Sequence, residues 1–358
     1  MNKNEYMNLN MKLLFKYAHD HKFEDFDTLF SKMEEELPLY EFWEAYLMRA
    51  QIKLYTTDLT ILDDLARAAR GGATPRFPLL LSLWQYDAVN RFVAYPKATG
   101  ALNAFLEVLP QVSEELSRWY GERSSVALQQ LQGEILYFMG DIEAALPFAE
   151  AHRYAESKNH IDTMLGLILE YRCYLGLIQP EKAHECMFNI IRHSKLYPEC
   201  VEIYERFRQW ANLTTGWSGD SPRFYEDEAG KKQPVLADRL EGIKFGTARD
   251  TALEAPFLEY AQKSYEGTYR LKQYYMDWFH AMYWLSIDDR KQAESYFRKV
   301  FENMVASGLL MPVIECGEQV MPLLKYMRRR DPNLCLDELM SRAADYEESL
   351  KQYRLADN

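Results

Sequence analysis

The sequence predicts an all-α fold in which short antiparallel helical hairpins stack into an α-solenoid. Three observations lead to this prediction. Small and large residues recur at fixed spacing within apolar stripes, related stretches repeat along the 358 residues, and strand-like alternation is confined to one segment. Because each hairpin of a solenoid contacts only its neighbours, a chain of this length can fold as one long array.

The clearest hairpin is HAMYWLSIDDRKQAESYFRKVF, residues 280–301. Ala281 and Ala293 are small, as two closely crossing helices require, and large residues flank them. We expect the turn between the helices at residues 286–289. Counted from Tyr274 as the first of about 34 positions, the small and large residues follow the tetratricopeptide pattern. The large residues are Trp284, Phe297 and Val300.

Two further stretches repeat this pattern. LQGEILYFMGDIEAALPFAEAHRYA places Gly133 and Ala145 at the small positions and Gly140 in the turn. LEYRCYLGLIQPEKAHECMFNII has Gly176 in its turn and Ala183 on its second helix. Weaker copies lie upstream, in LLFKYAHDHKFEDFDTLFSKM and FWEAYLMRAQIKLYTTDLTILDDLARAA. We therefore expect tetratricopeptide-type helical hairpins that form a superhelix, in preference to a closed bundle.

The helical spacing of apolar residues is interrupted most clearly at residues 213–235, where Gly, Pro, Ser and Thr are concentrated. We predict an N-terminal helical-repeat array over residues 1–212, an irregular linker or excursion over 213–235, and C-terminal helical repeats with a capping helix over 236–358. Within the break, FYEDEAGKKQPV could form a small hairpin around Ala229 and Gly230, although its proline weakens that prediction.

The last helix carries its own apolar stripe, with spacings of three and four residues. Capping the solenoid is the simplest role for this stripe. Pairing with a second copy in a homodimer, or leading into a further domain, are the alternatives. The stripe consists of Leu336, Leu339, Ala343, Tyr346, Leu350 and Tyr353.

The charge balance bears on one class of partner, nucleic acids. The chain has 42 Lys and Arg against 54 Asp and Glu, a net charge of −12, which argues against direct nucleic-acid binding. We interpret the one dense basic run, residues 328–330, as a solvated helix C-terminus. The sequence shows no signal peptide and no apolar run long enough for a membrane span. The five irregularly spaced cysteines indicate reduced, buried thiols, so we expect a cytoplasmic protein.

The sequence contains no recognisable catalytic constellation. GWSGD lacks the closing glycine of a nucleophile elbow, and AGKK does not have the glycine spacing of a phosphate-binding loop. The histidines and cysteines are not spaced as metal ligands. We therefore expect a non-enzymatic protein with no catalytic residues, no metal and no cofactor.

A binding site would lie in the concave groove of the superhelix, which the first helix of each repeat lines. The groove positions hold carboxylates and aromatics, which suit a cationic peptide, an amine or a sugar. The alternative is that several of these side chains fill the interior of the superhelix. The predicted groove residues are Gln130, Glu134, Tyr137, Glu170, Tyr275, Trp278 and Met282.

The C-terminal third has a more specific likeness. The stretch FHAMYWLSIDDRKQAESYFRKVFENMVASGLLMPVIECGEQVMPLLKYM resembles the closing repeats of the sensor region in MalT-like transcriptional regulators of the LuxR type. The preceding RLEGIKFGTARDTALEAPFLEYAQKSYEGTY is similar to the segment before those repeats, and the likeness covers roughly residues 125–350. The residues that carry it in the first stretch are Met311, Pro312, Val313, Glu315, Gly317, Leu323 and Leu324.

This resemblance implies a sensor that binds a small molecule, peptide or protein in its groove and relays its state to transcription. Such regulators usually carry an ATPase-like module before the repeats and always a helix-turn-helix module after them, and this sequence shows the motifs of neither. It would be the sensor portion of a longer regulator or a stand-alone relative. Two alternatives stay open. One is a protein–protein scaffold. The other is a repeat phosphatase or peptide-sensing regulator that acts on a response regulator, because such proteins of Gram-positive bacteria are similar in size and architecture.

Overall fold

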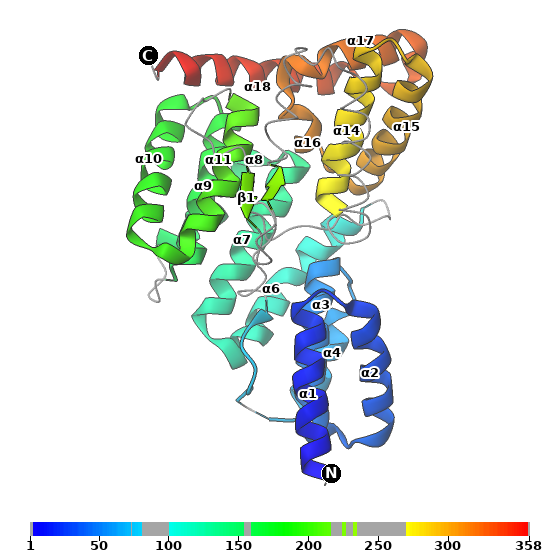
Figure 1. Cartoon of the computed structure of the whole chain (residues 1–358), viewed down its shortest axis with the longest axis vertical. Helices are drawn as coiled ribbons and strands as arrows, with labels where there is room; N and C mark the ends of the chain where they lie inside the picture. Colours follow the sequence, from blue (N-terminus) through cyan, green and yellow to red (C-terminus); the bar gives the residue numbers. More distant parts are fainter. Residues whose placement is uncertain are drawn as a thin grey trace.

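The computed structural model describes residues 3–72, 74–80, 100–153, 159–215, 224–226, 232–234 and 270–356. In these ranges every regular element is helical except one two-stranded hairpin (Figure 1). The all-α prediction is confirmed. No helix in these ranges has both the length and the apolar character needed to cross a membrane.

The N-terminal part is a series of helices that lie side by side in chain order (Figure 1). It also contains two short 3-10 helices, η1 (Glu150–Arg153) and η2 (Pro198–Cys200). The α-helices are α1 (Lys3–His19), α2 (Phe23–Glu36), α3 (Leu39–Thr56), α4 (Ile61–Ala68), α6 (Ala101–Tyr120), α7 (Glu122–Met139), α8 (Ile142–Ala149), α9 (His160–Gly176), α10 (Pro180–Leu196) and α11 (Val201–Thr215).

The C-terminal part begins with the hairpin of α14 (Arg270–Ser286) and α15 (Arg290–Ser307). These bounds confirm the turn predicted at residues 286–289. Shorter elements and one long final helix follow. They are α16 (Met311–Ile314), η3 (Gly317–Gln319), α17 (Met321–Arg330), η4 (Pro332–Leu334) and α18 (Asp337–Ala356).

Five of the helical hairpins close with the same turn. In each, one residue takes the left-handed conformation, and the next N–H donates to the carbonyl five residues earlier at 2.9 Å. This hydrogen bond is the mark of a Schellman helix end. The turn also recurs in α1–α2 and α3–α4, the hairpins that the sequence pattern marks only weakly. The left-handed residues are His21, Thr57, Gly140, Ile178 and Asp288.

Small residues lie where the helices cross, as expected. Ala281 and Ala293 are fully buried between α14 and α15, beside Phe297. At Gly133 of α7 an added Cβ would lie 2.8 Å from the Cβ of Phe148, so the two helices approach too closely for a larger residue.

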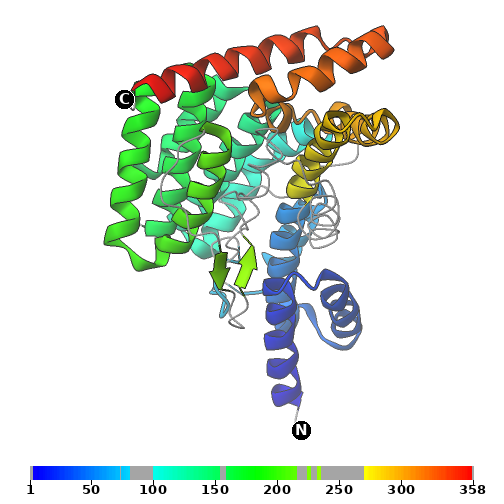
Figure 2. The same cartoon turned by 45° about the horizontal axis from the view of Figure 1, so that its top comes forward.

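The last helix, α18, joins the two parts of the molecule. It lies across the ends of α9 and α10 and reaches α16 and α17 at its other end (Figure 2). All six residues of the predicted apolar stripe are buried against helices of the same chain. The stripe is therefore covered internally and presents no surface to a second copy.

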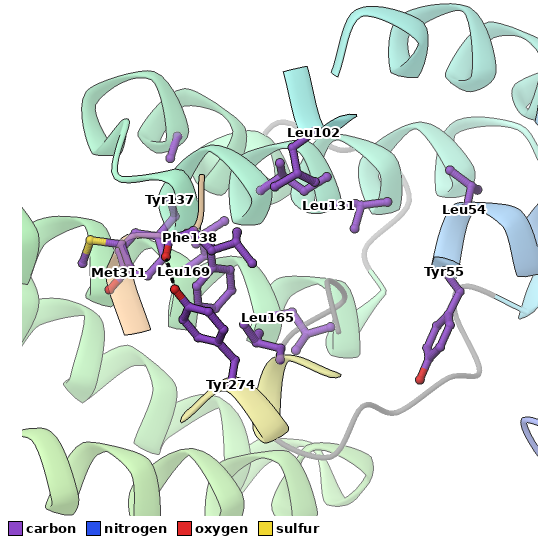
Figure 3. Packing of buried hydrophobic residues seen from close by; sticks show 14 of the residues in the cluster. Leu54, Tyr55, Leu102, Leu131, Tyr137, Phe138, Leu165, Leu169, Tyr274 and Met311 are labelled. Carbon is purple, nitrogen blue, oxygen red and sulfur yellow. Dashed lines mark hydrogen bonds between the residues drawn. The ribbon is translucent and has the colours of Figure 1, made fainter. Parts of the chain in front are cut away.

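A second connection lies at the C-terminal end of α7. The Leu310 N–H donates to the Phe138 carbonyl at 2.8 Å, and the Arg342 Nη2 donates to the Gly140 carbonyl at 2.7 Å. Tyr274 of α14 reaches toward this end of α7 and packs near Phe138 (Figure 3). The hydroxyl of Tyr274 donates to the Leu309 carbonyl at 2.8 Å. Three chain segments thus converge on one helix end.

The structure describes only part of the irregular segment predicted at residues 213–235. Its first residues belong to α11, which runs to Thr215. The expected small hairpin is present, since β1 (Phe224–Glu226) pairs antiparallel with β2 (Lys232–Pro234). Its turn at Ala229 and Gly230, and the sequence stretch 239–269 that carries part of the family likeness, lie outside the described residues.

The cysteines differ in one respect from the prediction of buried thiols. Cys173, Cys186, Cys200 and Cys316 are buried and form no disulfide. Cys335 is also unbonded, but it is exposed, because it lies in the turn between η4 and α18.

Candidate functional site

The predicted groove residues do not line an open groove. Glu134, Glu170 and Trp278 are buried, with at most 2% of each side chain exposed, and so are Gln130 and Tyr137. Tyr275 and Met282 are half-buried. The structure therefore contradicts their placement on an exposed concave surface, and the alternative of an interior position describes most of them.

Trp278 shows why the placement is wrong. It lies four residues after Tyr274 and three before Ala281, so helical periodicity puts all three on the face of α14 that meets α15. The indole packs edge-on against Phe297 with ring centroids 5.6 Å apart. Trp284, one of the large residues of the repeat pattern, is only half-buried.

The structure does bring Tyr137 and Tyr275 together, around a carboxylate. The Tyr137 hydroxyl donates to Oε1 of Glu315, and the Tyr275 hydroxyl donates to Oε2 at 2.5 Å. Arg172 and Tyr346 are buried around the same carboxylate and interact with it electrostatically. We call these five residues the joint cluster. They come from α7, α9, α14, the segment after α16, and α18, and so from both parts of the molecule.

The joint cluster contains two buried groups of opposite charge, Arg172 and Glu315, which interact electrostatically. Burial raises the pKa of Glu315, while Arg172 and the hydrogen bonds from the two tyrosines oppose that rise. Burial acts to lower the pKa of Arg172, but Glu315 and the nearby tyrosines outweigh it and the net shift is upward. Burial also raises the pKa of Tyr137 and Tyr275, and Glu315 adds to both shifts. The tyrosines therefore act as neutral donors that hold the carboxylate.

Glu170 belongs to a different buried network. The Arg153 Nε lies 2.9 Å from Oε1 of Glu170, and its Nη2 contacts the second carboxylate oxygen. The Sγ of Cys186 lies 3.6 Å from that second oxygen. Burial raises the pKa of Glu170, and Arg153 opposes the rise. Because its own chain supplies a cation, Glu170 does not face an incoming cationic ligand.

Gln130 and Glu134 of α7 are interior residues as well. The amide of Gln130 donates to the backbone carbonyl of Asp162 at the start of α9. This contact ties neighbouring hairpins together. Among the residues that the structure describes, no group of His, Cys, Asp and Glu side chains could hold a metal ion.

Sequence reasoning missed Arg172, Glu315 and Tyr346 as members of a site. Arg172 did carry a signal, since it is the one basic residue within the apolar stretch MLGLILEYRCYLG. A charged residue inside such a stretch needs a buried partner. Glu315 is one of the residues that carry the family likeness, and Tyr346 belongs to the C-terminal stripe. No local pattern could join them, because Tyr137 and Glu315 are 178 positions apart.

Comparison with known proteins adds no family. The chain matches no protein-family model, and no similar sequence is found among curated proteins. The class that the fold and the cluster define is therefore a protein of serial helical hairpins whose two parts meet at a buried charged network.

Proposed function

We propose that the chain is a non-enzymatic, cytoplasmic sensor and interaction module of tetratricopeptide type, whose stacked hairpins form a superhelix. It binds a small molecule, peptide or protein and relays its state to transcription, as the likeness to MalT-like regulators of the LuxR type implies. The five hairpins that share one turn support the repeat architecture, since a common turn gives successive hairpins a common geometry.

The single observation that carries the proposal is the joint cluster. The two hydrogen bonds to Glu315 and its electrostatic interaction with Arg172 join groups from both parts of the molecule, so they form together only when the two parts sit in one arrangement. Removing one hydrogen-bond donor leaves the buried carboxylate incompletely satisfied, which costs about 1–3 kcal/mol. The region where the N-terminal helices meet α14–α18 therefore favours discrete arrangements of the two parts over continuous bending between them.

A ligand would act on this equilibrium. A molecule that binds one arrangement of the two parts more tightly than another shifts the population toward it, by no more than its difference in affinity. Because most of the residues predicted for the groove, Trp278 among them, lie in the interior, we do not place the ligand against Trp278. The proposal requires only that binding changes the relation between the N-terminal helices and α14–α18.

A thermal-shift screen tests the proposal. The purified chain is heated with sugars, amines and short peptides, and a sensor shows a dose-dependent rise in melting temperature with at least one class. For an active ligand, exchange of backbone amides should change in α16–α18 as well as at the site of binding. The variant Glu315→Gln should still bind but lose the distant change. Glu302→Gln, an exposed change on α15, is the matched control.

Two outcomes would overturn the proposal in favour of its alternatives. If the chain responds to no ligand but co-purifies with a protein partner in fixed stoichiometry, it is a scaffold. A chain that dephosphorylates a response regulator in vitro is a phosphatase.

A further inference from the structure

An open cleft of about 980 Å³ lies on the C-terminal part of the molecule. The α14–α15 turn forms one wall, and α17 forms the other, with η3 and α18 at the edge. The cleft does not include any residue of the joint cluster. It is therefore a separate surface, and binding there does not depend on how the junction responds to a ligand.

The charge of the cleft is opposite to that of the chain. Four cationic side chains line it, Arg290, Lys325, Arg329 and Arg330, in a protein whose net charge is −12. Its two carboxylates already have partners within the chain. Asp288 pairs with Arg290 at 2.8 Å, and Glu318 pairs with Lys351 at 2.5 Å.

Among the described residues, no carboxylate pairs with Lys325 or Arg329. Both are exposed, and neither forms an ion pair with a described residue, whereas Arg330 pairs with Glu294 at 3.1 Å. They lie four positions apart on α17, where two like charges destabilise a helix. The helix dipole favours a cation in the last turn and so accounts for Arg329, but Lys325 lies one turn earlier. An anion held between them would relieve this repulsion.

The cleft also has an apolar component. Leu285 and Met321 are half-buried along it, and the exposed Pro322 and the half-buried ring of Tyr326 continue the same surface. Met321, Lys325 and Arg329 follow one another at spacings of four on one face of α17, so the apolar and cationic groups form a single stripe. A ligand that fits this stripe has an apolar part next to an acidic part.

We propose that this cleft docks a short acidic peptide segment of a partner protein, with carboxylates on Lys325 and Arg329 and an apolar side chain against Met321. The volume is far larger than a single phosphate or carboxylate group needs, and it is the size of sites that hold larger ligands. A long nucleic acid would be repelled by the acidic remainder of the chain, which a short peptide does not reach.

The test is fluorescence anisotropy with a labelled peptide of glutamate and leucine residues, against the full chain. The peptide should bind in low salt and weaken as salt is raised, while a peptide with glutamine in place of glutamate should bind at least about tenfold more weakly. The double variant Lys325→Glu, Arg329→Glu should lose at least about tenfold in affinity.

The matched control is Lys32→Glu, Arg123→Glu, which changes the net charge equally at exposed residues of α2 and α7. It should bind as the unchanged chain does. Circular dichroism and melting temperature establish that both double variants are folded. Because the ligand screen for the proposed function uses a different readout, failure here leaves that proposal standing.

Four results would overturn the inference. Equal binding to the Lys325→Glu, Arg329→Glu variant would place the peptide elsewhere. Complete competition by inorganic phosphate at equal concentration would reduce the cleft to a small-anion site. Salt-sensitive binding of duplex DNA that the same variant abolishes would make it a nucleic-acid surface. A dimer by sedimentation that this variant converts to a monomer would make the occupant a second copy of the chain.

Discussion

Glu315 is held in the interior by three other side chains, and this sets its contribution to stability. Tyr137 and Tyr275 each donate to one of its oxygens, and Arg172 supplies the opposite charge. The hydrogen bonds and the nearby positive charge offset the free-energy cost of burying the carboxylate. A substitute that forms only some of these interactions should therefore destabilise the fold. We therefore regard Glu315 as the residue on which the junction of the two parts most depends.

At Trp278 the expected result is loss of stability. Its ring is fully buried against Phe297, so Trp278→Ala should lower the free energy of unfolding by about 3–5 kcal/mol. Trp284→Ala, on the same helix but half-buried, should cost distinctly less. Urea unfolding of both variants measures the difference. Similar losses in the two variants would mean that the packing face of α14 is misplaced.

His21 should make stability depend on pH. Burial, with a smaller contribution from His19 and against the effect of Asp20, lowers the pKa of His21 from 6.5 to about 4. The unfolded chain therefore takes up the proton first as pH falls, and the stability that the neutral ring provides above pH 6.5 is lost as pH falls toward 4.

The variant His21→Phe isolates this effect, because phenylalanine keeps an aromatic ring beside Phe23 and Tyr55 but does not titrate. The stability of the unchanged chain relative to His21→Phe should be constant above neutral pH and should fall between pH 6.5 and about 4. Urea unfolding at a series of pH values measures it. A constant difference over that range would contradict a His21 that stays neutral in the folded chain.

At the scale of elements, the shared turn carries local strain that one substitution should relieve. Ile178 takes the left-handed conformation with φ 56°, which is unfavourable for a β-branched residue, and its side chain is 41% exposed. Ile178→Gly should therefore raise the free energy of unfolding by about 1 kcal/mol, as the cost of that conformation indicates. Thermal melting checks this, and a lower melting temperature would mean that the side chain contributes packing that outweighs the strain.

The hairpins could be predicted from sequence because their signals are local. The pattern of Ala281, Ala293 and Phe297 repeats at helical spacing, and Gly140 with Asp141 marks a turn within a few residues. The site could not be predicted in the same way. Which face of a helix is exposed depends on the neighbours that pack on it, and the prediction for Trp278 is wrong for that reason. The joint cluster depends on contacts between distant segments, which one sequence does not reveal.

At the scale of the whole molecule, the buried hydrophobic core runs continuously from α1 to α18. The final helix is central to this continuity, since it contacts α9 and α10 at one end and α16 and α17 at the other. Its Tyr346 lies in the joint cluster, and its Arg342 caps the end of α7. We infer that the N-terminal helices next to the junction and α14–α18 unfold as one cooperative unit, held together at this cluster.

Native-state hydrogen exchange of the unchanged chain and of Glu315→Gln tests this claim most directly. In the unchanged chain, the amides of α7, α9, α14 and α18 should share one large opening free energy. In Glu315→Gln that free energy should fall by about 1–3 kcal/mol, because the tyrosine hydrogen bonds to a charged acceptor are weakened. The fall should be greater in α14 and α18 than in α7 and α9, because the two sides then open separately. Independent opening in the unchanged chain, or no change in the variant, would contradict the account.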